Sequence, residues 1–113
     1  MTQFKIFRDK LGRYRFLFKP NSELITLTSE PYNSISLCLQ NIRFFKKHAF
    51  NDSYFVRQKA SCGSHYFTFE KLSNSELIAT SESFLTFNAM ENMITFVKTS
   101  AKATKIDDFV YAI

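Results

Sequence analysis

The chain has 113 residues, of which 45% are hydrophobic and 22% charged, with only two glycines and two prolines. This composition is typical of a globular domain and excludes a disordered or fibrous chain. The formal net charge of +5 weakly favours a polyanionic partner. Because the sequence starts without the apolar core of a signal peptide, and no apolar run could span a bilayer, we predict a cytoplasmic protein with no membrane contact.

The first half of the chain predicts three antiparallel strands. A short β-rich run covers Phe4 to Arg8, and after a turn at Leu11-Gly12 the segment from Arg13 to Lys19 alternates between aromatic and mostly basic residues. A second turn at Pro20-Asn21-Ser22 precedes a third strand from Leu24 to Thr28. Alternate side chains of a strand point to opposite faces, so the second strand has an apolar inner face made of Tyr14, Phe16 and Phe18.

Both halves of the chain then change to helical spacing. Ser34 and Thr86 are the predicted N-caps, because a hydroxyl group can accept a hydrogen bond from a free N–H of the first helical turn. The apolar stripe of the first helix is Ile35, Cys38, Leu39, Ile42 and Phe45, and that of the second is Phe87, Met90, Ile94 and Val97. We expect the segments after the helices, Phe50 to Ser53 and Thr104 to Ala112, to add strands to sheet edges.

The two halves also resemble each other in sequence. The run from Gly12 to Phe18 aligns with Gly63 to Phe69, and the run from Ile42 to Lys46 aligns with Ile94 to Lys98. The two shorter matches between them are Ser22-Glu23-Leu24-Ile25 with Ser75-Glu76-Leu77-Ile78, and Thr28-Ser29-Glu30-Pro31-Tyr32 with Thr80-Ser81-Glu82-Ser83-Phe84. We therefore predict a single domain of two repeats, 1–52 and 53–113, whose strands join in one sheet with both helices on one face.

This tandem pattern resembles the YegP-like family of small uncharacterised bacterial proteins. The resemblance rests on Gly-Arg-Tyr-Arg-Phe from Gly12, Ser-Glu-Leu-Ile from Ser22, Thr-Ser-Glu-Pro-Tyr-Asn-Ser from Thr28, and Asn41-Ile42 through Lys46-Lys47. It implies an α+β fold made by tandem duplication of a β-β-β-α-β unit. The implied sheet is single and mainly antiparallel, with two helices on one face and exchanged C-terminal strands. Family members with one copy are expected to pair as homodimers, and the family has no established activity. The chain departs from the family's Asn-Gly-Glu turn at Asn21-Ser22-Glu23 and Asn74-Ser75-Glu76.

The outer face of the predicted sheet carries the most suggestive group of side chains. Cations and aromatic rings on an open sheet can bind single-stranded nucleic acid, since phosphates meet the cations while bases stack on the rings. The candidate polyanion-binding residues are Lys5, Arg13, Arg15, Lys19 and Tyr66. The alternative is that long basic side chains only keep an open antiparallel sheet soluble.

A second basic group ends the first helix and consists of Arg43, Lys46, Lys47 and His48. Cations at this end complement the negative pole of the helix dipole, which explains the group without a ligand. An anion or partner site is the alternative.

Catalysis is not indicated by the sequence. Cys62 and His65 are close in sequence, but the register places His65 on the inner face, and no second Cys or His pair has metal-ligand spacing. Cys38 is expected to be a core residue. The chain also lacks a phosphate-binding glycine loop and a nucleophile elbow. We predict a protein that is not an enzyme and has neither cofactor nor metal; thiol chemistry at Cys62 is the alternative.

Phe44 and Phe96 are the candidate partner surface, because each helix stripe needs only one ring per turn. Alternatively, the exchanged strand and the tail Phe109-Val110-Tyr111 cover them. The leading functional hypothesis is a noncatalytic binding or interaction module, with a polyanion such as single-stranded nucleic acid as the candidate ligand. The alternative is a structural protein that self-associates, as a homodimer for example, through surface phenylalanines or a sheet edge.

Overall fold

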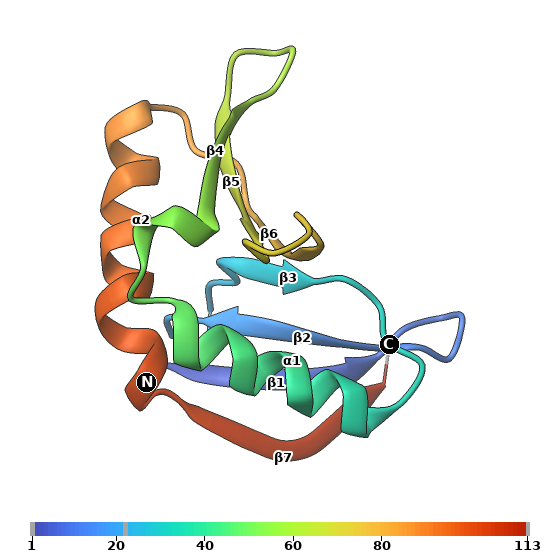
Figure 1. Cartoon of the computed structure of the whole chain (residues 1–113). Helices are drawn as coiled ribbons and strands as arrows, with labels where there is room; N and C mark the ends of the chain where they lie inside the picture. The colour runs from blue at the N-terminus through green and yellow to red at the C-terminus, as the bar shows by residue number, and fades with distance from the viewer. Residues whose placement is uncertain (1, 22, 113) are drawn as a thin grey trace.

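The protein has an α+β fold in which seven strands form one mixed sheet in the order β4-β5-β6-β3-β2-β1-β7 (Figure 1). The computed structural model describes residues 2–21 and 23–112, so Ser22 of the second predicted turn lies outside the described residues. The elements are β1 (Gln3–Arg8), β2 (Tyr14–Lys19), β3 (Leu27–Ser29), α1 (Ile35–His48), η1 (Asp52–Tyr54), β4 (Phe55–Lys59), β5 (His65–Glu70), β6 (Leu77–Ser81), α2 (Phe87–Ser100), η2 (Ala101–Ala103) and β7 (Lys105–Ala112).

The three predicted antiparallel strands of the first half are confirmed, although the third is shorter than predicted. Strand β1 pairs with β2, and β2 pairs with β3. Gly12 takes φ 77°, a conformation that favours glycine, in the turn between β1 and β2. The prediction that β3 begins at Leu24 is wrong, because the side chain of Asn21 accepts hydrogen bonds from the N–H groups of Glu23 and Leu24. Those two donors are therefore taken by a turn rather than by the sheet.

Both predicted helices and both N-caps are confirmed. The hydroxyl of Ser34 accepts a hydrogen bond from the N–H of Leu37 at the start of α1, and Thr86 caps α2 in the same way. The predicted stripes are wrong at their first residues, since Phe87 is 51% exposed and Ile35 is 39% exposed. These residues stand in the first helical turn, before the helices reach the core.

The segments that follow the two helices adopt different secondary structure. The predicted strand at Phe50 to Ser53 is wrong, because the segment forms a turn and the start of η1. The side chain of Asn51 accepts a hydrogen bond from the N–H of Ser53 and caps this short helix. The predicted strand in Thr104 to Ala112 is confirmed as β7, which pairs in parallel with β1. The sheet is therefore mixed, with β7 at one edge and β4 at the other.

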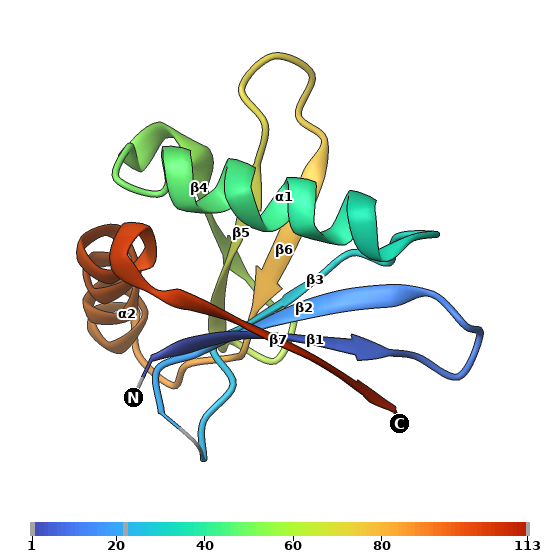
Figure 2. The ribbon, with the colours of Figure 1, turned by 90° about the horizontal axis from the view of Figure 1, so that it is seen from below.

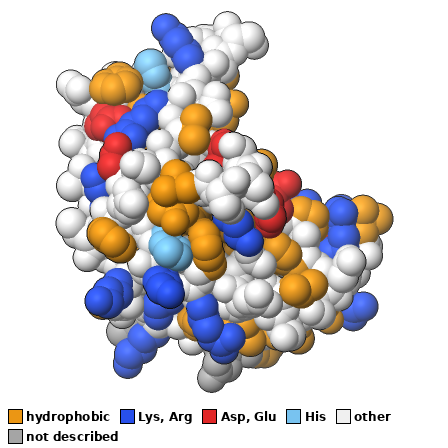
Figure 3. Space-filling model, viewed as in Figure 1, with side chains coloured by type: hydrophobic (Ala, Val, Ile, Leu, Met, Phe, Trp, Pro, Cys, Tyr) orange, Lys and Arg blue, Asp and Glu red, His pale blue; other side chains and the backbone are white. Residues whose placement is uncertain are grey.

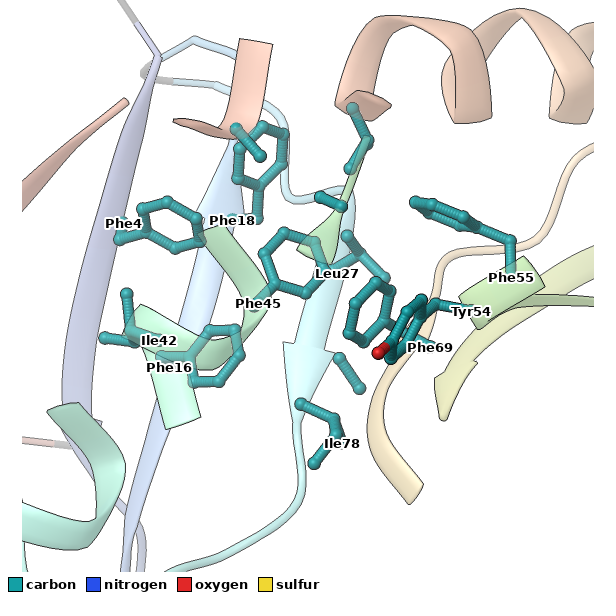
Figure 4. Packing of buried hydrophobic residues seen from close by; sticks show 14 of the residues in the cluster. Phe4, Phe16, Phe18, Leu27, Ile42, Phe45, Tyr54, Phe55, Phe69 and Ile78 are labelled. Carbon is teal, nitrogen blue, oxygen red and sulfur yellow. The ribbon is translucent and has the colours of Figure 1, made fainter. Parts of the chain in front are cut away.

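The core lies between the helices and one face of the sheet. Figure 2 shows α1 running across the strands, with α2 close to its C-terminal end. Phe45 of α1 stands at the centre of the aromatic packing, with its ring centroid 5.8 Å from that of Phe4 and 4.5 Å from that of Phe69 (Figure 4). Met90 and Ile94 of α2 belong to the same buried cluster. Both helices thus cover one face, which leaves the opposite face of β1, β2 and β3 open to solvent.

A candidate ligand groove on the open sheet face

A groove with a volume of about 480 Å³ lies on the open face of the sheet. The groove is formed by the outward-facing residues of β1 and β2. Burial alternates along both strands, so each residue that faces the core is followed by one that faces outward. Its floor follows the pairing of Lys5 with Leu17 and of Leu17 with Thr28 across three strands. The lining residues are Lys5, Phe7, Leu17, Lys19, Ile25, Thr28, Tyr111 and Ala112.

One wall of the groove is held by a polar network between β1 and β7. The Nζ of Lys5 donates a hydrogen bond to the hydroxyl of Tyr111 at 3.1 Å and lies 3.7 Å from a carboxylate oxygen of Asp107. The same hydroxyl donates to Asp107 at 2.8 Å. The hydrogen bond to Tyr111 raises the pKa of Lys5, and the N–H of Phe109 is the main cause that lowers the pKa of Asp107. The network therefore fixes Tyr111 at the groove while neutralising part of the charge of Lys5.

Two of the predicted polyanion-binding residues lie outside the groove and share a carboxylate. Asp9 Oδ2 lies 3.5 Å from Nε of Arg13 and 3.4 Å from Nε of Arg15. The pKa of Asp9 is lowered chiefly by its hydrogen bond from the backbone N–H of Arg13. Arg15 also donates to the backbone carbonyl of Ser29 at 3.2 Å. Both guanidinium groups thus lie against Asp9, with Arg15 held by hydrogen bonds, whereas Nε of Arg13 makes an ion pair but no hydrogen bond with the described residues.

The structure brings Lys5 and Lys19 together but not Tyr66. Both lysines line the groove, whereas Tyr66 lies on β5, which β6 and β3 separate from β2. Three strand spacings amount to about 14 Å. The sheet is also strongly twisted, and the β4–β5 hairpin projects away from β1 and β2 (Figure 1). Tyr66 is therefore a separate surface feature.

The candidate partner residues Phe44 and Phe96 stand in different surroundings. Phe44 is half-buried, with its ring centroid 4.4 Å from His48 and 5.9 Å from Tyr54. These contacts come from α1 and η1, and Lys71 after β5 lies over the same ring at 5.1 Å, so the cover is not the tail that the alternative proposed. Phe96 is 36% exposed and packs edge-on against Phe18 at 6.4 Å.

Cys62 and His65 do not act on each other in the described structure. The thiol of Cys62 is exposed and lies 3.2 Å from the hydroxyl of Ser64, a hydrogen bond that lowers its pKa. The ring of His65 packs edge-on against Phe87 at 5.9 Å. The residues that the structure describes contain no cluster of three or more His, Cys, Asp or Glu side chains arranged to hold a metal ion. Cys38 is buried, as predicted, and burial raises its pKa to about 12.

Sequence reasoning missed the contribution of β7 to the groove. Ile106 and Val110 pack against the core while Tyr111 lines the opposite face, so alternation at the end of β7 was a usable signal. Alternation does not predict which strand lies beside β7. Its neighbour, β1, is far away in the sequence, and alternation reports only on the local backbone. Within the described residues, no helix is long and apolar enough to cross a membrane.

The mixed sheet, with its helices on one face and a groove on the other, places the chain among small α+β proteins with a known fold. The solution structure of YegP from Escherichia coli, a protein of unknown function, matches with a TM-score of 0.87 and 23% identity, covering 96% of this chain and 93% of that chain. A UPF0339 protein from Shewanella oneidensis also matches, with a TM-score of 0.87 and 22% identity, covering 96% of this chain and 92% of that chain. No protein-family profile matches the sequence.

Sequence relatives identify the family. The "UPF0339 protein in ptx operon 5′ region" of Stutzerimonas stutzeri is 31% identical over 103 residues, which cover 91% of this chain and 92% of the relative. A UPF0339 protein of Bordetella pertussis is 30% identical over 108 residues, 96% of each chain. YegP of Escherichia coli is 25% identical over 105 residues, 93% of this chain and 94% of the relative. The chain belongs to the UPF0339 family of small, uncharacterised bacterial proteins, which confirms the predicted resemblance to YegP.

Proposed function

We propose that the chain is a noncatalytic binding module and that the groove on the open sheet face binds single-stranded nucleic acid. The observation that carries this proposal is a groove of about 480 Å³ that combines two lysines with the rings of Phe7 and Tyr111. Lysine ammonium groups attract phosphates, and bases of any sequence stack on aromatic rings. The proposed ligand is therefore a short single strand without strong sequence preference.

The composition of the groove supports a noncatalytic role. Its described lining residues carry amines, a phenol, one threonine hydroxyl and apolar groups, but no carboxylate, imidazole or thiol. Most acid–base and nucleophilic mechanisms use one of these three groups. The exposed thiol of Cys62 lies on the turn before β5 rather than in the groove.

The test is a titration of the protein into a labelled single-stranded oligonucleotide at several salt concentrations. We expect binding at low salt that weakens steeply as salt rises. Phe7→Leu should weaken it by about fivefold or more, because stacking on one ring is worth about 1–3 kcal/mol per base. Lys19→Gln should weaken it and flatten the salt dependence.

Arg13→Gln is the matched control, because it removes one positive charge next to the groove. The guanidinium of Arg13 already lies against Asp9, so we expect a change of less than about twofold. Two results would overturn the proposal: an absence of binding at low salt, or equal losses from Lys19→Gln and Arg13→Gln.

Self-association is the second candidate function, and the exposure of Phe96 favours it. This ring is 36% exposed at the margin of the core, and Phe50 is 71% exposed. Light scattering over a concentration series would then show an increasing mass that Phe96→Ser reduces. A constant monomer mass would exclude this candidate.

We also infer that the two halves, 1–52 and 53–113, are copies of one unit within a single domain, and that β7 occupies the place of an exchanged strand. Both halves run strand-strand-strand-helix, and the isolated bridge between Tyr14 and Tyr32 corresponds to that between His65 and Phe84. Strand β7 follows the second helix but pairs with the first strand of the other half. The matched serine substitutions described in the Discussion test this inference.

A further inference from the structure

A second basic surface lies where the C-terminal end of α1 meets η2 and the start of β7. Figure 3 shows Lys and Arg side chains gathered at the lower left, where Figure 1 places these segments. Arg43, Lys46, Lys47 and Lys102 line a depression of about 390 Å³ together with Ile106. We call these four cations and Ile106 the α1 patch. It stands apart from the groove, with which it shares no lining residue.

The cations of the α1 patch differ in their pairing from several other basic residues of the chain, although Lys10 and Lys59 likewise have no ion pair among the described side chains. None of the four forms an ion pair with an acidic side chain of the described residues. By contrast, Arg13 and Arg15 share Asp9, and Lys98 of α2 pairs with Asp52. The α1 patch therefore gathers into one depression four cations that have no ion-pair partner among the described residues.

The side chain of Lys46 in the α1 patch is held in place by the segment between η2 and β7. Nζ of Lys46 donates a hydrogen bond to the backbone carbonyl of Thr104 at 2.6 Å and lies 6.0 Å from the ring centroid of Phe4. Thr104 is itself only 4% exposed, and its hydroxyl donates to the carbonyl of Ser100. An ammonium group has three donors, so Lys46 keeps two for a ligand while one holds it in place.

The helix dipole does not account for the whole patch. Lys46 and Lys47 stand in the last turn of α1, where they complement its negative pole, but Arg43 lies a turn earlier and Lys102 belongs to η2. Helix α2 has the same length and carries one basic residue in its last turn. It has Thr95 and Thr99 at the positions of Arg43 and Lys47. A helix of this kind is therefore stable without the cluster.

We propose that the α1 patch binds an oligophosphate, a ligand with several phosphate groups linked in a row. A triphosphate carries about four negative charges near neutral pH, which matches four cations that have no acidic partner among the described residues. A row of linked phosphates offers oxygens to cations from both α1 and η2 at once, whereas a single phosphate offers fewer contacts. The patch has no aromatic ring among its lining residues, so it offers nothing on which a base could stack. The ligand chemistry is thus that of the phosphate chain alone, whether free or at the end of a nucleotide.

The test is calorimetric titration of the full chain with inorganic triphosphate, with ATP and with orthophosphate, at low and at moderate salt. We expect triphosphate and ATP to bind with similar affinity and orthophosphate to bind much more weakly at the same ionic strength. The double variant Arg43→Thr with Lys47→Thr gives α1 the residues that α2 carries. It should weaken triphosphate binding by about tenfold or more.

The double variant Lys19→Gln with Arg13→Gln is the control, because it removes the same charge from the open sheet face. It should bind triphosphate as the unaltered chain does, and the α1 variant should keep its affinity for the oligonucleotide. Failure of this proposal is thereby distinguished from failure of the groove proposal. Amide shifts in an NMR titration of the unaltered chain should centre on Lys102 and Thr104. The proposal is overturned if triphosphate does not bind at low salt, if orthophosphate binds equally well, or if both double variants lose the same affinity.

Discussion

Ser29 and Ser81 hold the same position in the two halves and make the same pair of hydrogen bonds. Each hydroxyl accepts from a buried backbone N–H, that of Phe16 at 2.8 Å or that of Phe67 at 2.9 Å, and donates to the carbonyl of the next residue. Ser29→Ala and Ser81→Ala each leave one buried donor unpaired. We expect each to lower the free energy of unfolding by about 1–3 kcal/mol.

Urea unfolding followed by circular dichroism measures this loss. Ser36→Ala is the control, because this serine is exposed on α1. A loss below about 0.5 kcal/mol at either buried serine, within the range of ordinary surface substitutions, would contradict the prediction. A large difference between the two would contradict the inference that the halves are equivalent copies.

The two cysteines should differ sharply in reactivity. Cys62 is exposed and the hydrogen bond with Ser64 lowers its pKa, whereas Cys38 is buried with a pKa of about 12. Because the thiolate is the reactive form, iodoacetamide at neutral pH should modify Cys62 alone in the folded chain. Mass spectrometry would then find one adduct, and a second only after denaturation. Equal labelling of both thiols before denaturation would refute this.

At the scale of the element, β4 is one of the two edge strands, and its outer edge carries no neighbour among the described strands. Arg57 takes the place on β4 that buried Ile6 takes on β1, where β7 covers it. The guanidinium is held by Glu91 at 2.8 Å and by Asp52 at 2.9 Å. A charge near the inner face of an edge strand discourages pairing with other chains.

Arg57→Ile should therefore increase self-association. The change removes the charge and gives β4 an apolar edge, so the apparent mass should rise with concentration in analytical ultracentrifugation. Lys10→Ile adds the same side chain to an exposed turn and should stay monomeric. Equal association of the two variants would show that added hydrophobicity, rather than the strand edge, is responsible.

The same ion-pair network predicts a loss of stability in acid. Hydrogen bonds from Arg57 are the main cause that lowers the pKa of Asp52 and of Glu91 below their ordinary values of 3.8 and 4.5. The stabilisation is therefore present above those ordinary values and is lost as the pH falls through the lowered ones. Because these side chains are partly exposed, we expect a loss below about 1 kcal/mol between pH 6 and pH 3. Urea unfolding should show that the free energy of unfolding depends less on pH in Arg57→Met than in the unaltered chain. An unchanged pH dependence would contradict the role given to this network.

Local sequence patterns predicted which face each strand residue occupies better than they predicted which side chains pair with one another. Alternation placed Phe16 and Phe18 in the core and Lys5 and Lys19 on the open face, because the period of a strand depends only on the local backbone. The strand predicted at Phe50 to Ser53 failed because one side chain, that of Asn51, caps a short helix there. Arg13 and Arg15 are also in the predicted binding set. In the structure, the turn before β2 places Asp9 against both guanidinium groups. Such pairings depend on how a turn closes, which residue type alone does not specify.

At the scale of the whole molecule, β7 closes the sheet and should be required for stability. Its partly buried residues Ile106 and Val110 pack against the core beside β1. A chain that ends at Thr104 exposes the edge of β1 and loses these contacts. We expect it to show no cooperative thermal unfolding, whereas Phe109→Ser, which alters a 59% exposed side chain of the same strand, should melt close to the unaltered protein. A shortened chain with the same melting temperature would refute this prediction.

The pairing of β1 with β7 has a further consequence for biosynthesis. Strand β1 leaves the ribosome well before β7, and Gln3 pairs with Lys105 at a very long sequence separation. Contacts of such long sequence separation form slowly, because a large loop must close before they are gained. The outer edge of β1 therefore stays unpaired until β7 has been synthesised. During that interval the nascent chain is most exposed to aggregation, and a chaperone that covers an open strand would be of most use to it.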